Sequence, residues 1–191
     1  MIRQLRSFPN QLTLLRLAFI PFIVINVVSQ NYRWALALFV LAGISDFLDG
    51  TLARVLKQRT TLGEYLDPIA DKMLLSTMFL VLSIMHKIPW KYTVLVFSRD
   101  VFILIASAVL YITNTLRDFR PSVFGKLNTC AQIAAVFFVM LRELSQSHWI
   151  AAARRISLGA TMALTIISGV HYVILAGQRM RASHGSSAPA A

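Results

Sequence analysis

The 191-residue chain is 57% hydrophobic and 14% charged, with a mean hydropathy of +0.64. Charged residues make up about 25% of a typical soluble domain, so this composition excludes a water-soluble globule. The formal net charge of +11 suits an anionic membrane leaflet or phosphorylated ligands. The apolar segments leave no broad basic face for nucleic acid. One cysteine, Cys130, excludes an intramolecular disulfide and a multi-cysteine metal site.

The first ten residues are basic and carry one apolar stripe. Ile2, Leu5 and Phe8 recur every three residues, which predicts a short interfacial amphipathic helix over residues 1–10. The apolar run that follows has no small-residue cleavage pattern. We therefore expect it to be retained as a membrane span rather than removed as a signal peptide.

The hydropathy predicts an all-α integral membrane protein with six transmembrane helices. Each apolar run is about 20 residues long, which is the length that crosses a hydrocarbon core of about 30 Å. The tail over residues 182–191 is small, polar and proline-containing, and we expect it to be disordered. The predicted spans are Gln11–Val28, Trp34–Leu56, Leu66–Met85, Tyr92–Ile112, Val123–Leu141 and Ile156–Leu175.

An even number of spans places both termini on the same side of the membrane. Lys and Arg residues outside the spans are more numerous on the terminal side than in the opposite loops, which favours cytoplasmic termini. The loop after the second span, and any chemistry beside it, would then face the cytoplasm.

Four of the eight acidic residues lie inside or at the ends of the second and third spans, where an ionisable group is costly and indicates function. At about 100° per residue, Asp46 and Asp49 share one face of the second helix. Asp67 and Asp71 share one face of the third. The short connection makes the two helices antiparallel neighbours, so the sequence predicts that the four carboxylates converge near one membrane surface.

Four negative charges in a low dielectric repel one another unless cations neutralise them. Two divalent ions would balance the four aspartates. Oxygen ligands with no His or Cys nearby favour Mg²⁺ or Mn²⁺. Paired metals of this kind hold a diphosphate and stabilise displacement at phosphorus, so these residues predict phosphoryl-group chemistry at a membrane face.

Structural explanations stay open for some of the same residues. Asp67, which precedes Pro68, suits a helix N-cap. Gly50 and Ala53 fit close helix packing, and Arg16 could snorkel to the surface or reach a phosphate. Asp46 and Asp49 could instead form structural ion pairs with nearby cations, namely Arg16, Arg54 or Lys72.

The segment from Asp46 to Asp71, DFLDGTLARVLKQRTTLGEYLDPIAD, resembles the signature of the CDP-alcohol phosphotransferases. That signature reads Asp, two residues, Asp-Gly, two residues, Ala-Arg, eight residues, Gly, three residues, Asp, three residues, Asp. Every fixed position is filled without a gap. Pro9–Arg16 (PNQLTLLR) is similar to the opening of the glycerophospholipid-forming branch. The resemblance implies a six-helix domain over residues 11–177, usually homodimeric, with a polar cavity open to the cytoplasm.

The resemblance also implies roles for the signature residues. The four aspartates would hold two metals on the diphosphate of CDP-diacylglycerol. Asp71 would in addition be the general base, an assignment that spacing alone does not make. The acceptor hydroxyl would attack the β-phosphorus, and CMP would leave. The CDP site would comprise Asp46, Asp49, Gly50, Ala53, Arg54, Gly63 and Asp67, with Arg54 on phosphate.

Two cations lie within the fourth and fifth spans, where an uncompensated charge is expensive. They are Arg99 and Lys126, and Asp100 is an obvious structural partner for Arg99. If both cations face the cavity, they form a pocket for a phosphate on the acceptor, with Arg117 and Arg120 at its mouth. Glycerol 3-phosphate fits such a pocket.

Gly125–Gln132 (GKLNTCAQ) resembles phosphatidylglycerophosphate synthases and the related CMP-forming cardiolipin synthases, and Ser98–Asp100 (SRD) resembles the cardiolipin synthase branch at least as much. The resemblance favours glycerol 3-phosphate as acceptor, with phosphatidylglycerol as the alternative. A divalent-cation carrier is a less favoured function of another class, because a cation path has no use for Arg54 facing its carboxylates. We expect a homodimer in a bacterial inner membrane, with a cytoplasmic active site and no nucleic-acid partner.

Overall fold

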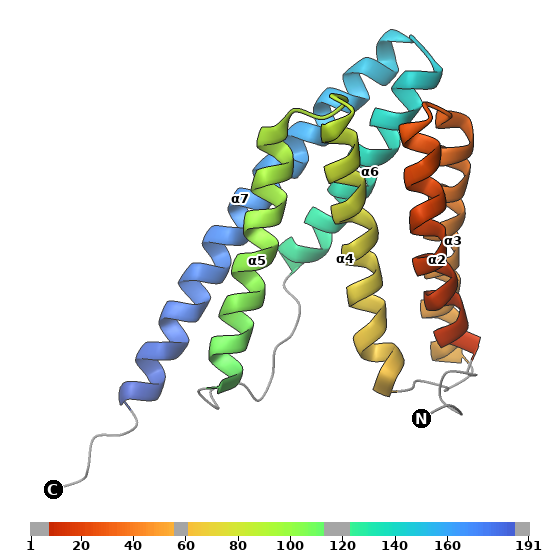
Figure 1. The fold of residues 1–191 in the computed structure, drawn as a ribbon. Coiled ribbons are helices and arrows are strands. Elements are labelled where there is room, and N and C mark those ends of the chain that lie inside the picture. The colour runs from red at the N-terminus through yellow and green to blue at the C-terminus, as the bar shows by residue number, and fades with distance from the viewer. Residues whose placement is uncertain (1–7, 56–60, 113–122, 186–191) are drawn as a thin grey trace, which may run out of the picture. The chain divides into compact units, whose positions relative to one another are not determined.

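The computed structural model describes residues 8–55, 61–112 and 123–185, and over these residues the chain is helical and contains no strand (Figure 1). The connections are short, as in other helical bundles. The helices are α2 (Phe8–Val28), α3 (Tyr32–Val55), α4 (Thr61–Ile84), α5 (Trp90–Ile112), α6 (Val123–Leu144) and α7 (His148–Gly185).

The chain divides into two compact units. The first comprises Met1–Pro89 and Val136–Arg154, and the second comprises Trp90–Ala135 and Arg155–Ala191. The first unit therefore holds α2, α3, α4 and the adjoining ends of α6 and α7. The second unit holds α5 and the remaining parts of α6 and α7.

In the first unit, α2 packs against both α3 and α4 (Figure 1). Ile23 and Val27 of α2 are fully buried, as are two alanines of α3. Small side chains allow helix backbones to approach closely, which is how helices associate in membranes. The buried apolar side chains described on the three helices are Ile23 and Val27 of α2, Tyr32, Ala35, Phe39 and Ala42 of α3, and Ala70, Leu74, Leu75, Met78, Phe79, Val81 and Leu82 of α4.

The observed helices follow the predicted spans closely up to α6. Two differences concern α7, which begins at His148 rather than Ile156 and continues to Gly185, into the tail expected at residues 182–191. Phe8–Asn10, expected at the membrane surface, belong to α2. The rest of the interfacial segment and of the tail lies outside the described residues.

Within the described residues, two helical stretches are long and apolar enough to cross a membrane. They are Gly125–Leu144 and His148–Val170, while Leu14–Val28 and Tyr32–Ser45 are shorter apolar helices. Six helices are thus observed in the described part of the chain, and the six membrane spans remain a prediction.

Candidate active site

The signature aspartates occupy the ends of α3 and α4 that the connection at residues 56–60 joins. Asp46 and Asp49 lie on α3, and Asp67 and Asp71 lie on α4. The helical spacing that puts each pair on one face is therefore present in both helices. Side chains from Asp46 through Asp67 lie outside the described residues, and so the predicted convergence of four carboxylates stays a prediction. The same holds for the expected CDP contacts Gly50, Ala53, Arg54 and Gly63.

Asp71 is the signature carboxylate whose surroundings the structure describes. Arg16 of α2 reaches it across the first unit, and its Nη1 donates to Asp71 Oδ1 at 2.5 Å. The Arg16 side chain is 0% exposed, whereas that of Asp71 is 39% exposed. Arg16 thus does not snorkel to the surface, and its observed partner Asp71 is one that the sequence did not suggest. The alternative pairing with Asp46 or Asp49 lies outside the described side chains.

This arrangement anchors Asp71 to α2. The charge-assisted hydrogen bond from Arg16 engages the Oδ1 oxygen of the Asp71 carboxylate. Partial exposure keeps the group accessible to a ligand. The donor chemistry of the four aspartates fits Mg²⁺ or Mn²⁺. Among the described side chains, no cluster of three or more potential metal ligands occurs.

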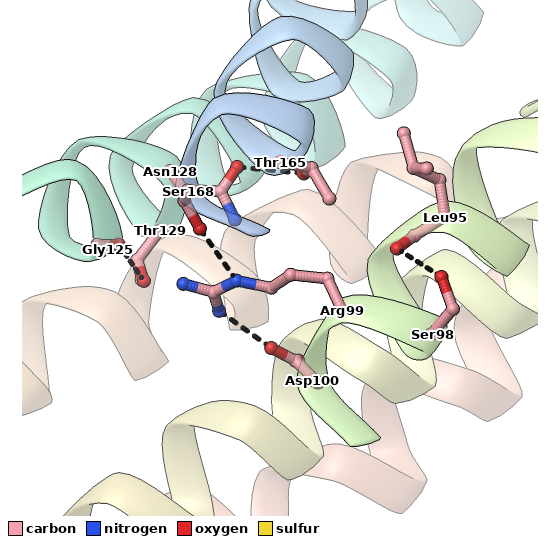
Figure 2. Close-up of polar contacts among 9 residues, drawn as sticks. All are labelled: Leu95, Ser98, Arg99, Asp100, Gly125, Asn128, Thr129, Thr165 and Ser168. Atoms are coloured by element: carbon pink, nitrogen blue, oxygen red, sulfur yellow. Dashed lines mark hydrogen bonds and ion pairs between the residues drawn. The ribbon is translucent and has the colours of Figure 1, made fainter. Parts of the chain in front are cut away.

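The predicted acceptor cations fare differently from one another. Arg99 of α5 is tied down, because its Nη1 donates to Asp100 Oδ1 at 2.8 Å and its Nε donates to Ser168 Oγ at 3.0 Å (Figure 2). Lys126, in the first turn of α6, is exposed. Arg117 and Arg120 lie outside the described residues.

Arg99 also borders an open pocket of about 450 Å³ between α5 and α7 within the second unit. Most of its lining is apolar, and the polar side chains in the lining are those of Ser98, Arg99 and Thr165. Such a surface suits a ligand with a polar head and an apolar body. The lining residues are Leu95, Ser98, Arg99, Phe102, Thr165, Ile166, Gly169 and Val170.

Sequence reasoning missed a buried polar stripe on α7. Its four members recur every three or four residues and so share one face. Thr165 Oγ1 donates to Asn128 Oδ1 of α6 at 3.0 Å, and Ser168 accepts the bond from Arg99. The helical spacing of hydroxyl side chains in an apolar segment was the available signal. The stripe comprises Ser157, Thr161, Thr165 and Ser168.

Comparison with known proteins identifies the family of the chain. The sequence profile of the CDP-alcohol phosphatidyltransferases matches residues 6–170. A human protein named cardiolipin synthase (CMP-forming) is 32% identical over 148 residues, which is 68% of this chain and 48% of the relative. A Mycobacterium tuberculosis protein named "probable phosphatidylglycerophosphate synthase" is 34% identical over 179 residues, covering 89% of this chain and 81% of the relative.

The chain thus spans about half the length of the human relative and most of the length of the mycobacterial one. The profile covers all of α2 to α6 and most of α7, including every signature position. Proteins of this family are embedded in membranes and act with divalent metals, in keeping with the apolar helices and the carboxylates. The chain belongs to the CDP-alcohol phosphatidyltransferase family.

Proposed function

We propose that the protein transfers the phosphatidyl group of CDP-diacylglycerol to glycerol 3-phosphate, forming phosphatidylglycerophosphate and releasing CMP. The observation that carries the proposal is the uninterrupted signature on α3 and α4, with the accessible Asp71 carboxylate anchored by Arg16. The relative covered over most of both chains bears the name of this activity. We further propose a homodimer in a bacterial inner membrane, with the active site on the cytoplasmic side.

The four aspartates, Asp46, Asp49, Asp67 and Asp71, would hold two divalent ions, Mg²⁺ or Mn²⁺. Such ions neutralise the diphosphate and stabilise charge that develops at phosphorus. The small residues Gly50, Ala53 and Gly63 would let the cytidine diphosphate approach the helix backbones, and the Arg54 guanidinium would bind a phosphate oxygen.

The proposed reaction comprises a proton transfer to a residue of the chain, attack on phosphorus and departure of CMP. Asp71 accepts the proton of the acceptor hydroxyl, and the hydroxyl oxygen forms a new bond to the β-phosphorus. The bond between that phosphorus and the bridging oxygen breaks, and CMP leaves with the electron pair. Arg16 keeps the Asp71 carboxylate oriented from α2 during this exchange.

Phosphatidylglycerol is the second candidate acceptor, and the pocket beside Arg99 favours it. Apolar side chains such as Leu95, Phe102 and Ile166 line the pocket, and these suit the acyl chains of a lipid acceptor better than a water-soluble one. The product would then be cardiolipin, the product indicated by the name of the human relative.

The acceptor is identified by supplying each alcohol separately to the purified protein with CDP-diacylglycerol and either Mg²⁺ or Mn²⁺. CMP release and the mass of the lipid product are measured. Phosphatidylglycerophosphate supports the first candidate, and cardiolipin supports the second. No CMP release with either alcohol and either metal would contradict both and would favour a cation carrier.

We expect Asp71→Asn to abolish turnover, lowering kcat by at least about 100-fold because the base is lost. The variant should still fold and bind CDP-diacylglycerol. Glu64→Gln, on the same helix but at a position that the signature leaves unspecified, is the matched control and should retain activity. Wild-type turnover by Asp71→Asn would show that another group is the base.

A further inference from the structure

Two neighbouring amides on α6 are buried with donors that have no partner among the described residues. Asn128 is 0% exposed and Gln132 is 4% exposed, and they lie four residues apart on one helical face. The unpartnered atoms are Asn128 Nδ2 and Gln132 Nε2. Both residues belong to the second unit.

The orientation of Asn128 is fixed from α7. Because Thr165 Oγ1 donates to Asn128 Oδ1, the Asn128 nitrogen is left as a donor. One helical turn along α7, Ser168 holds the Arg99 guanidinium. Figure 2 shows the Asn128 amide nitrogen directed toward the side on which that guanidinium lies. Two residues one turn apart on α7 thus hold the Asn128 amide and the Arg99 guanidinium.

Leaving these donors unmet is unfavourable. A buried donor without an acceptor has lost its hydrogen bond to water and gained none in return, and the interior of a membrane bundle supplies little water to replace the bond. Two such donors in adjacent turns are accounted for when a ligand brings oxygen atoms to them. A neutral amide suits a neutral oxygen such as a hydroxyl, whereas the adjacent Arg99 suits an anionic phosphate oxygen.

We propose that Asn128 and Gln132 bind the glycerol hydroxyl that does not react, while Arg99 binds the phosphate ester of the same molecule. The pair would be the specificity determinant that selects a glycerol phosphate ester over a simpler alcohol. This inference rests on the proposed function, and it holds for glycerol 3-phosphate and phosphatidylglycerol alike because both contain that group.

The experiment compares each glycerol acceptor with its propane-1,3-diol analogue, which lacks the middle hydroxyl. For glycerol 3-phosphate the analogue is 3-hydroxypropyl phosphate, and for phosphatidylglycerol it is phosphatidylpropanediol. We expect the wild-type protein to prefer the glycerol acceptor at least tenfold in kcat/KM, because the analogue leaves buried donors unpaired.

Gln132→Met is the variant of choice, since it keeps the side-chain length and removes a donor that bonds to no described residue. We expect the acceptor preference to fall to about twofold, through a rise in acceptor KM, with the KM for CDP-diacylglycerol unchanged. The melting temperature in detergent should hold or rise, because an unmet buried donor is gone. A structural amide would give the opposite pattern of lower stability and unchanged preference, which would overturn the inference.

Thr161→Val is the matched control. Its hydroxyl is equally buried, but it donates to the Ser157 carbonyl of its own helix at 2.9 Å. The control should retain the wild-type preference. If the wild-type protein uses an acceptor and Gln132→Met still discriminates, the inference falls and the proposed function stands. If the wild-type protein uses neither acceptor, both fall.

Discussion

Arg16 is the described residue most closely tied to the proposed chemistry. Its side chain is fully buried, and its guanidinium contacts the carboxylate proposed as the base. Removing one partner of a buried pair leaves an uncompensated charge, which costs about 3–5 kcal/mol when both groups are inside. Asp71 is partly exposed, so a smaller penalty is expected here.

We expect Arg16→Met to lower the free energy of unfolding by about 1–3 kcal/mol and kcat by at least about tenfold, because Asp71 loses its anchor. Arg16→Lys keeps the charge without the planar guanidinium, so its stability and its kcat should lie between those of the wild type and those of Arg16→Met. A double-mutant cycle with Asp71→Asn, followed by denaturant unfolding in detergent, measures the coupling, which should be about 0.5–3 kcal/mol. Additive losses would mean that the two residues do not act together.

The pairing of Arg16 with Asp71 could not be predicted from residue spacing in the sequence. Spacing within one helix places residues on a face, and so the aspartate pairs could be predicted from the signature alone. Arg16 and Asp71 are 55 positions apart on different helices, and only the packing of α2 against α4 brings them together. Hydropathy does not specify that packing.

Among the elements, the start of α7 illustrates a second limit. Arg154 and Arg155 lower the hydropathy of the first two turns, and so the predicted span begins only at Ile156. The helix nevertheless begins at His148. Arg154 Nη2 donates to the Lys87 carbonyl at 2.6 Å. This hydrogen bond satisfies the charged guanidinium within the folded first unit. A search for apolar runs does not detect a helix whose first turns are polar.

The same end of the first unit carries an ion pair that makes a prediction about pH. Lys87 Nζ donates to Glu143 Oε2 at 2.5 Å and lies 5.6 Å from the centre of the Tyr32 ring. The hydrogen bond to Glu143 raises the pKa of Lys87 above 10.5. The pair therefore stabilises the fold fully below pH 10.5, and this contribution is lost as pH rises through the higher folded value.

We expect Glu143→Gln to lower stability by up to about 1 kcal/mol at neutral pH, since the pair is partly exposed. The difference in melting temperature from wild type should shrink as the pH rises above about 10.5. Lys91→Met, which removes an exposed lysine of α5 in the second unit, is the control and should show no such pH-dependent difference. A difference that grows with pH would contradict the assigned pair.

For the whole molecule, composition predicted the class and the signature predicted the family, because both depend on residues close together in sequence. The number of helices followed from the apolar runs. The acceptor did not follow, since the groups around Arg99 come from α5, α6 and α7 and meet only in the folded second unit. Spacing along any one of these helices shows only a polar stripe.

The proposed topology can be tested on the full chain in intact cells. A Cys130→Ala background allows single cysteines to be placed at Ser7, at Gln146 between α6 and α7, and at Ser187. Six spans with cytoplasmic termini predict that a membrane-impermeant maleimide labels only Gln146→Cys from outside. Ser7→Cys and Ser187→Cys should react only after permeabilisation, and the parent Cys130→Ala should stay unlabelled throughout. Labelling of just one terminal cysteine from outside would require an odd number of spans, and the loop joining α3 and α4 would then need a new assignment of side.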